Sequence, residues 1–525
     1  MRHPNITLVV ADDLGFSDVS CFGGEIPTPN IDRLARTGVR LTQFYNTARC
    51  SPSRASLLTG RHPHETGIGV LTSPSLPDGY PGDLSDDVPT IAEVLSEAGW
   101  STWLSGKWHL SADVTTPSRS WPTRRGFQRF FGTLAGCGSY FEPQTLSRGE
   151  EPVTEREDGF YYTDAISSNA VQWITDHHRA GADRPFFLYL AYTAPHWPLH
   201  ATAADLAEHR GRFDAGWDRL REERLRRLTA EGIVSPQTSL SDRDPSQPAW
   251  DDAPDRAWQV TRMEAYAAQI TAMDRGIGRV LQALEDTGAL DDTLVVFLAD
   301  NGGCAEELPI GPLEDFVRKD EVLRRPTPSG APMRVGNSPD VVPGGPDTYA
   351  SYGVPWANLS NTPFRMYKRW VHEGGISTPF IASWPNGGLA EQAVVHTAYQ
   401  LTNVVPTLLD AAGVARPERV EGTSMLPALR GEPVTERSLY WEHIGNAAIR
   451  RGRWKLVRDH PAPWELYDID ADRTERHDLA ADFPDVVADL AAEWQVWADR
   501  VGVVPWDRML AATAAAGRPE ASAEE

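Results

Sequence analysis

The chain has 525 residues, of which 41% are hydrophobic and 23% are charged, and its formal net charge at pH 7 is -23. This length is sufficient for a sizeable core in one large α/β unit. Phosphate contacts require clustered Lys and Arg side chains, so we expect no nucleic-acid partner for a chain this acidic. No stretch of the sequence is long and apolar enough to cross a bilayer, so we expect no membrane partner.

Two acids follow the first apolar segment of the chain. Residues 6–11 form a short β-branched run, which predicts a buried parallel strand. Asp12 and Asp13 come directly after it, at the end of the strand where open α/β sheets bind ligands. Adjacent buried carboxylates repel each other, and a divalent cation relieves that repulsion. The alternative is a pair of loop acids that cap a helix.

A cysteine begins the next predicted helix. Residues 39–44 predict a strand, and the segment from Ala48 to Gly60 predicts a helix, with Pro52 in its first turn and Gly60 as its stop. Cys50 therefore lies at a helix N-terminus, where backbone N–H groups favour an anion. Arg54 lies about one turn further on and can point to the same place. Alone, this pattern also fits a buried or capping cysteine before an ordinary helix.

Two later strands are followed by basic or histidine side chains. Residues 100–104 are strand-like and precede Lys107 and His109, which alternate and so point to one side of an extended segment. Residues 184–190 predict another strand, and His196 follows it in a proline-rich loop. Each residue alone would be read as a surface lysine or a packed histidine. Their shared position after strands favours a joint site.

A further β-branched strand, residues 294–299, ends at Asp300 and Asn301. It repeats the arrangement at Asp12 and Asp13, with oxygen donors directly after a buried strand. Oxygen ligands suit Ca²⁺ or Mg²⁺ rather than zinc. The sequence therefore indicates a site for a hard cation.

The remaining pattern sets the fold class. Amphipathic segments predict helices at residues 28–35, 88–98, 164–174, 262–284 and 402–412. The charged residues 201–258 predict solvated helices and a loop, and the Pro- and Gly-rich residues 304–363 predict a long loop that shapes the substrate entrance. Strands alternating with helices predict an α/β fold with a large mixed, mostly parallel sheet flanked by helices.

The pattern changes after about Gly431. Short strands are predicted at residues 438–442, 447–450, 454–457 and 465–467, followed by an amphipathic helix at residues 480–499. We therefore expect a catalytic α/β domain over residues 1–435. A small C-terminal subdomain over residues 436–525 would contain an antiparallel sheet, a helix and a frayed tail.

One segment resembles a known family motif. The order Cys50-Ser51-Pro52-Ser53-Arg54, continuing Ala-Ser-Leu-Leu-Thr-Gly, resembles the signature of the type I sulfatases, which belong to the alkaline phosphatase superfamily. Other segments match further motifs of that family: Asp12-Asp13-Leu14-Gly15, Gly106-Lys107-Trp108-His109, Ala194-Pro195-His196-Trp197-Pro198, Asp300-Asn301-Gly302-Gly303 and the residues around Lys368. The resemblance runs from Asn5 to about Leu479 and is closest to bacterial cytosolic arylsulfatases. One departure is Ser377, where the family often has an arginine that makes a structural contact.

The resemblance implies two cofactors. A formylglycine-generating maturation enzyme would oxidise Cys50 to formylglycine. One Ca²⁺ per chain would be held by the oxygen donors at the two strand ends, together with an oxygen of the modified cysteine: Asp12, Asp13, Asp300 and Asn301 with residue 50.

The resemblance also implies roles for the basic residues. Arg54 would hold the hydrated aldehyde, Lys107 would neutralise the sulfuryl oxygens with calcium, and His109 would assist release of sulfate. His196 and Lys368 would contact the ester side, where His196 would protonate the leaving oxygen.

The implied reaction is hydrolysis of a small aryl or alkyl sulfate monoester through a covalent sulfated intermediate. A thiolate would form an adduct with no easy exit, whereas one oxygen of a geminal diol attacks sulfur and the other expels sulfate. The nearest alternative is a phosphonate monoester or phosphodiester hydrolase that uses the same site. Two others are a metal phosphatase with unmodified Cys50 and a non-catalytic binding protein, which would lack one or more site residues.

Cysteine usage bears on the compartment. The chain has four cysteines, none spaced as CxxC, so we expect neither a zinc site nor a redox pair. If Cys50 is modified, the three that are left do not pair completely. The apolar run at residues 6–11 ends in two acids, unlike a secretory signal. We therefore expect a reducing, cytoplasmic location.

Overall fold

The computed structural model describes residues 3–72, 79–155, 157–310, 327 and 330–515 of the chain. Within these residues, eleven strands form one large sheet: β1 (Asn5–Ala11), β2 (Val39–Tyr45), β3 (Ser101–Gly106), β4 (Arg129–Thr133), β5 (Leu146–Arg148), β6 (Glu151–Pro152), β7 (Phe186–Ala191), β8 (Thr293–Ala299), β11 (Ser377–Ser383), β12 (Ala393–Val395) and β13 (Tyr399–Gln400). Their order is β12-β2-β11-β8-β1-β7-β3-β4-β5-β6, and β13 also pairs with β2.

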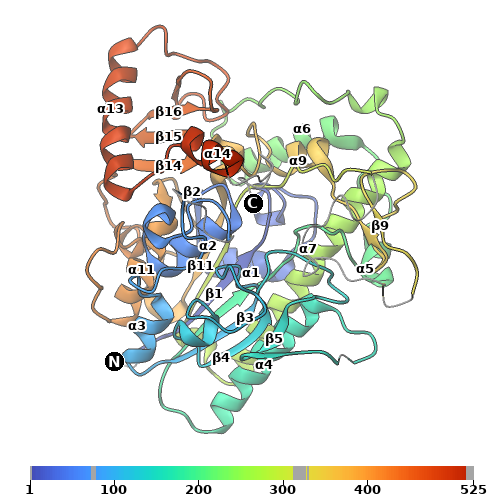
Figure 1. Cartoon of the computed structure of the whole chain (residues 1–525), viewed down its shortest axis with the longest axis vertical. Helices are drawn as coiled ribbons and strands as arrows, with labels where there is room; N and C mark the ends of the chain where they lie inside the picture. Colours follow the sequence, from blue (N-terminus) through green and yellow to red (C-terminus); the bar gives the residue numbers. More distant parts are fainter. Residues whose placement is uncertain (1–2, 73–78, 156, 311–326, 328–329, 516–525) are drawn as a thin grey trace.

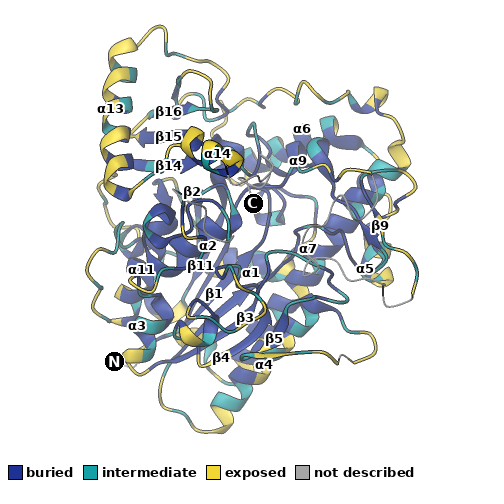
Figure 2. Cartoon of the chain, viewed as in Figure 1, coloured by how far each residue is buried: buried dark blue, intermediate teal, exposed yellow. Residues whose placement is uncertain are grey.

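The centre of this sheet is parallel. β1 lies between β8 and β7, so that Ile6 is opposite both Leu294 and Phe187, and β3 continues in the same direction beside β7. β11 runs antiparallel to both β8 and β2. The central strands are buried on both faces, as β-branched apolar runs require (Figure 2). The predicted large mixed, mostly parallel sheet is confirmed.

Helices cover both faces of the sheet (Figure 1). Side chains of β1 alternate between two cores, because successive residues of a strand point to opposite faces. Val9 packs in one core with α1 (Pro29–Thr37), α4 (Tyr162–Arg179) and α7 (Arg256–Asp286). Leu8 packs in the other with α2 (Cys50–Thr59), α3 (Ile91–Glu97) and α11 (Val404–Ala412). None of the described helices combines the length and apolar character needed to cross a membrane.

Smaller elements complete this part of the chain: α5 (Ala203–Glu208), α6 (Gly216–Ala230), α9 (Gly353–Ser360), α10 (Glu373–Ile376), α12 (Leu426–Leu429), β9 (Arg334–Val335) and β10 (Thr348–Tyr349). The prediction that the charged helices are solvated is wrong for one face of α6. Arg224 is fully buried there, 2.8 Å from Asp18 and 2.6 Å from Glu25. Part of the long predicted loop, residues 311–326 and 328–329, lies outside the described residues. Its described part is not all loop, because it contains β9, β10 and α9.

The C-terminal region, residues 436–515, contains the predicted small antiparallel sheet and helix. The sheet consists of β14 (Leu439–His443), β15 (Asn446–Arg451), β16 (Trp454–Arg458) and β17 (Glu465–Asp468), and α13 (Pro484–Val501) covers one face (Figure 1). The other face packs on Tyr45 of β2, in the large sheet, and on Ile376 of α10. A last helix, α14 (Trp506–Ala515), includes the start of the tail that we expected to fray.

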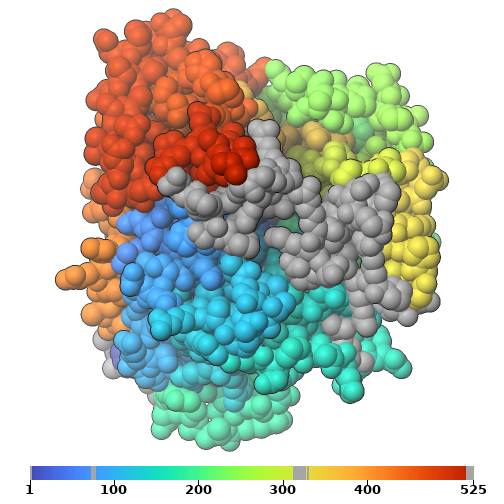
Figure 3. Space-filling model, in the orientation of Figure 1, coloured from blue at the N-terminus to red at the C-terminus, as the bar shows by residue number. Residues whose placement is uncertain are grey.

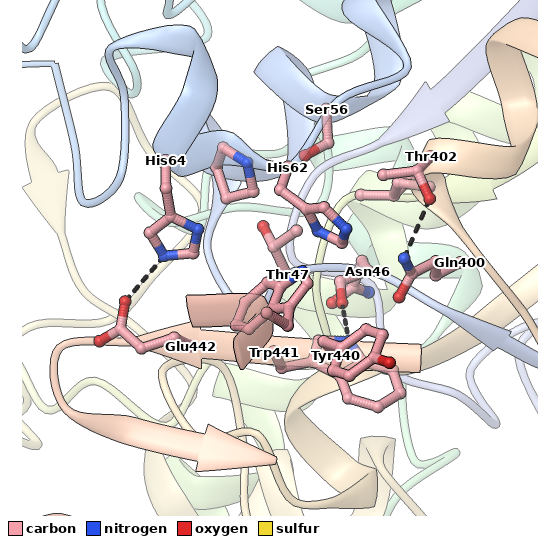
Figure 4. Close-up of a pocket in the computed structure, with 13 residues that line it drawn as sticks. Asn46, Thr47, Ser56, His62, His64, Gln400, Thr402, Tyr440, Trp441 and Glu442 are labelled. Atoms are coloured by element: carbon pink, nitrogen blue, oxygen red, sulfur yellow. Dashed lines mark hydrogen bonds and ion pairs between the residues drawn. The ribbon is translucent and has the colours of Figure 1, made fainter. Parts of the chain in front are cut away.

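The C-terminal region packs closely against the N-terminal part of the chain. Trp506 of α14 shares a cluster with Val70 and Tyr80. In the space-filling view the red atoms of the C-terminal region border the blue atoms of the N-terminal part (Figure 3). A cavity of about 10 Å³, room for about one water, lies between the segment after α2 and β14. There Nε2 of His64 and Oε2 of Glu442 lie 2.8 Å apart, within hydrogen-bond distance (Figure 4).

Candidate active site

The residues predicted to form the site come from six segments that meet at the carboxyl edge of the large sheet. Four segments follow strands, one is the start of α2 and one precedes α10: Asp12 and Asp13 after β1, Lys107 and His109 after β3, His196 after β7, Asp300 and Asn301 after β8, Cys50 and Arg54 in α2, and Lys368 before α10. All are buried except His109, which is half-buried. Parallel strands bring these ends together because their carboxyl termini share one edge.

Cys50 is the first residue of α2, as predicted, and is 3% exposed. Its Sγ lies 3.4 Å from Nδ1 of His109. Burial raises the pKa of the Cys50 thiol, although the positive charges of Lys107 and Lys368 act in the opposite direction. In the absence of a bound cation, burial therefore favours the neutral thiol of an unmodified Cys50.

Arg54 connects the helix with the acids of two strands. Its Nε and Nη2 both lie 2.8 Å from Oδ2 of Asp300, and Nη2 lies 3.9 Å from Oδ1 of Asp12. Its Nη1 donates to the main-chain oxygen of Lys107 at 3.1 Å. The guanidinium thus holds α2 against the ends of β1, β3 and β8.

Two ammonium groups pair with the acids after β1. Nζ of Lys107 donates to Asp12 at 2.6 Å, and Nζ of Lys368 donates to Asp13 at 2.9 Å. Lys368 Nζ also lies 3.3 Å from Nε2 of His196. Nδ1 of His196 forms a 2.6 Å hydrogen bond with the main-chain oxygen of Trp197, so Nε2 is the ring nitrogen that faces the site.

The carboxyl groups have opposite pKa shifts. Burial disfavours ionisation of Asp13, but the charges of His196 and Lys368 outweigh burial and lower its pKa to about 2. For Asp300, burial and the charge of Asp12 outweigh Arg54 and raise the pKa to about 6. Near Asp300, the neighbouring cations therefore do not fully compensate burial and the charge of Asp12, and a bound cation would stabilise the ionised carboxylate.

The donor set fits a divalent metal ion. Among the buried side-chain atoms of the described residues, Asp12 Oδ1 and Asn301 Oδ1 accept no hydrogen bond. Ligand atoms of Asp12, Asp13 and His196 lie within 4.8 Å of one another. Buried polar oxygens without a partner are costly, and bound calcium or magnesium would satisfy them.

Two site residues have left-handed backbone conformations. The φ angle is 63° at Asp13 and 56° at His109. Such conformations are uncommon outside glycine and cost free energy, so the surrounding contacts must maintain them. The half-buried ring of His109 lies over Gly136, where a Cβ atom would come within 2.2 Å of its Cε1. Glycine at this position is therefore needed to admit the imidazole.

Sequence reasoning missed the residues that join these segments. Glu306 contacts both Arg49, next to Cys50, and Trp197, next to His196. Tyr266 of α7 donates to the main-chain oxygen of Asp13 at 3.1 Å. A carboxylate in the segment leaving β8 was the available signal for Glu306. Its partners are distant in sequence, so the local pattern did not reveal them.

Comparisons with known proteins identify the family of the chain. The sulfatase family pattern matches residues 4–414, and the pattern described as "N-sulphoglucosamine sulphohydrolase, C-terminal" matches residues 364–495. An arylsulfatase of Klebsiella aerogenes is 32% identical over 82% of this chain and 90% of its own length. An uncharacterized sulfatase of Schizosaccharomyces pombe is 32% identical over 96% of this chain and 95% of its own.

Solved structures share the fold. The crystal structure of Ps i-CgsB superposes with a TM-score of 0.65 and 27% identity, over 94% of this chain and 92% of that one. The extent of the family match and the relatives agree with the resemblance seen in the motifs. The chain therefore belongs to the sulfatase family and is a hydrolase of sulfuric esters.

Proposed function

We propose that the chain hydrolyses a small aryl or alkyl sulfate monoester with the residues gathered around the N-terminus of α2, after Cys50 has been converted to formylglycine. The observation that carries the proposal is the placement of three buried cationic groups, on Arg54, Lys107 and Lys368, among carboxylates at this helix N-terminus. A sulfate ester is anionic, and such groups stabilise charge that develops on its oxygens in the transition state.

Calcium is the metal that we propose for the site. Asp12, Asp13, Asp300 and Asn301 would hold it together with an oxygen of the modified residue 50. The Oδ1 atoms of Asp12 and Asn301, which accept no hydrogen bond, support this assignment. When bound, the ion supplies Lewis-acid polarisation of the sulfuryl oxygens.

The two sides of the site have different roles in this proposal. On the side of α2, Lys107 neutralises the sulfuryl oxygens and Arg54 holds the hydrated aldehyde of residue 50. Nδ1 of His109, 3.4 Å from Sγ of Cys50, is placed to take a proton from side chain 50. Nε2 of His196 and Nζ of Lys368, 3.3 Å apart, face the leaving group, where His196 donates the proton.

The other functions are less well supported. A phosphonate monoester or phosphodiester hydrolase uses the same site, but the relatives are named for sulfate esters. The raised pKa of the Cys50 thiol disfavours a phosphatase with an unmodified cysteine. A non-catalytic binding protein would lack at least one site residue, and here every predicted residue is present.

The relatives suggest a range of substrates. One is named steryl-sulfatase, from Mus musculus, at 29% identity, and Ps i-CgsB, at 26% identity, was solved with k-i-k-neocarrahexaose. The arylsulfatase of Klebsiella aerogenes, at 32% identity, favours an aryl ester for this chain.

Three further expectations belong to this proposal. A formylglycine-generating maturation enzyme is a partner. The location is cytoplasmic, which the four free cysteines of the structure support. The chain divides into a catalytic domain, residues 1–435, and a C-terminal subdomain, residues 436–525, and the separate four-stranded sheet supports this division.

Mass analysis and a substrate panel test the proposal together. The tryptic peptide with residue 50 should carry oxygen in place of sulfur and react with hydrazides. The same preparation should hydrolyse nitrophenyl sulfate much faster than bis(nitrophenyl) phosphate or a phosphonate monoester. Full activity with an unmodified thiol would overturn the role of formylglycine, and preference for a phosphodiester would overturn the substrate class.

A further inference from the structure

One carboxylate outside the predicted site joins two of its segments. Oε1 of Glu306 lies 2.7 Å from Nη1 of Arg49, and Oε2 accepts a hydrogen bond from Nε1 of Trp197 at 2.8 Å. Glu306 itself follows β8, five residues after Asn301. Its two oxygens therefore hold donors from two other segments against the end of a third.

Both partners are directly adjacent to residues of the site. Arg49 is the N-cap residue of α2 and precedes Cys50. Trp197 follows His196, and its main-chain oxygen bonds to Nδ1 of that histidine at 2.6 Å. The indole of Trp197 and its carbonyl thus connect the carboxylate of Glu306 to the imidazole through one residue.

The charge of Glu306 suits this bridging position. Burial opposes its ionisation, but the positive charges of Lys368 and Arg49 hold its pKa well below its usual range. An ionised carboxylate accepts two charge-assisted or strong hydrogen bonds at once, whereas an amide offers a single acceptor oxygen. Glutamine at this position would leave one of the two donors facing an N–H group.

We propose that Glu306 is a positioning residue of the reaction, which holds Trp197 and Arg49 so that the loop of His196 stays in place against the helix that begins at Cys50. The inference rests on the proposed role of His196 toward the leaving group. Displacement of a catalytic group by about 1 Å is enough to cost roughly 10²-fold in rate. Loss of the bridge therefore acts on proton donation more than on binding of the sulfuryl group.

The test measures kcat/KM of the mature, calcium-loaded enzyme against aryl sulfates of graded leaving-group pKa. Glu306→Gln should slow weakly activated esters about 10- to 100-fold and nitrophenyl sulfate much less. Trp197→Phe keeps an aromatic ring but removes the indole N–H. It should likewise make log kcat/KM fall more steeply with the pKa of the leaving group. Thermal melting of each variant shows whether the fold is retained.

Glu307→Gln is the matched control. Glu307 pairs with Arg262 at 3.1 Å and is half exposed, and neither residue belongs to the predicted site. Its replacement should leave the leaving-group dependence unchanged, even if the melting temperature falls.

A double-mutant cycle with His196→Ala separates this inference from the proposed function. If Glu306 acts through His196, adding Glu306→Gln to His196→Ala should cause little further loss for weakly activated esters. Multiplicative losses, or an equal loss for all esters in Glu306→Gln alone, would overturn the positioning role while leaving the role of His196 intact. If His196→Ala itself slows all esters equally, both assignments fail.

Discussion

Nη2 of Arg473 donates a hydrogen bond to Oγ of Ser377 at 2.8 Å, which joins the C-terminal region to the start of β11. Nε of the same guanidinium lies 3.1 Å from the buried carboxylate of Glu373, which also pairs with Lys455 at 2.9 Å. The motif resemblance predicts an arginine at the position of Ser377. The structure instead places the guanidinium of Arg473, from a distant part of the chain, against this serine.

Replacement of Arg473 should destabilise the protein. Arg473→Ala leaves Glu373 with fewer partners in a buried environment, and breaking such a pair costs about 3–5 kcal/mol in free energy of unfolding. Because Lys455 still pairs with Glu373, we expect the lower end of this range, measured as a lower melting temperature. Arg476→Ala is the control, because its 3.6 Å pair with Asp242 is exposed. Equal melting temperatures for the two variants would contradict the prediction.

Calcium should stabilise the folded chain as well as support turnover. Chelation should remove activity and lower the melting temperature, and added Ca²⁺ should restore both, because a ligand that binds only the folded state favours it by about 2.7 kcal/mol at 100 times its Kd. Asp300→Ala should abolish the calcium-dependent rise in melting temperature. Asp292→Ala, at the opposite end of β8, should retain it. Restoration by zinc alone would refute the calcium assignment.

His196→Ala should affect esters according to their leaving groups. Nitrophenolate departs without a proton, whereas an alkoxide does not, and general acid catalysis contributes about 10²–10⁴-fold. Alkyl and weakly activated aryl sulfates should therefore lose far more rate than nitrophenyl sulfate, in a plot of log rate against leaving-group pKa. Lys368→Ala should behave similarly but more weakly. His178 is exposed on α4, and His178→Ala is the control. It should leave the rates with nitrophenyl sulfate and with weakly activated sulfates unchanged.

His200 should make stability depend on pH below neutrality. Its buried ring forms a 2.7 Å hydrogen bond with the main-chain oxygen of Thr348, and burial lowers its pKa from 6.5 to about 4. Between these two values the unfolded chain binds a proton that the folded chain does not, so stability falls as pH decreases from about 6.5 to about 4. The residue contributes about 3 kcal/mol to this loss.

His200→Gln tests that dependence, because an amide can donate to Thr348 and still accept from the main chain without titrating. The free energy of unfolding of the variant, measured from pH 7 to pH 4, should decrease less steeply than that of the wild type. Identical slopes would show that His200 does not remain neutral in the folded protein.

The sequence by itself determined the local features of this protein. The apolar run before Asp12 and Asp13 predicted β1, and Pro52 and Gly60 predicted the helix that begins at Cys50, because strand and helix patterns depend on residues close in sequence. The motif order also predicted which side chains would gather at the carboxyl edge of the sheet. The structure brings these side chains into contact there, and their catalytic and metal-binding roles stay predictions.

Only the tertiary structure decided the contacts that join distant segments. The charged sequence around Arg224 predicted a solvated helix. Arg224 is instead buried against Asp18, because α6 packs on the loop after β1. Glu306 and Arg473 gave no periodic or motif signal, since their partners lie far away in sequence. Long-range pairing of charges depends on how strands are ordered in the sheet and where the C-terminal region docks, and neither is encoded in local spacing.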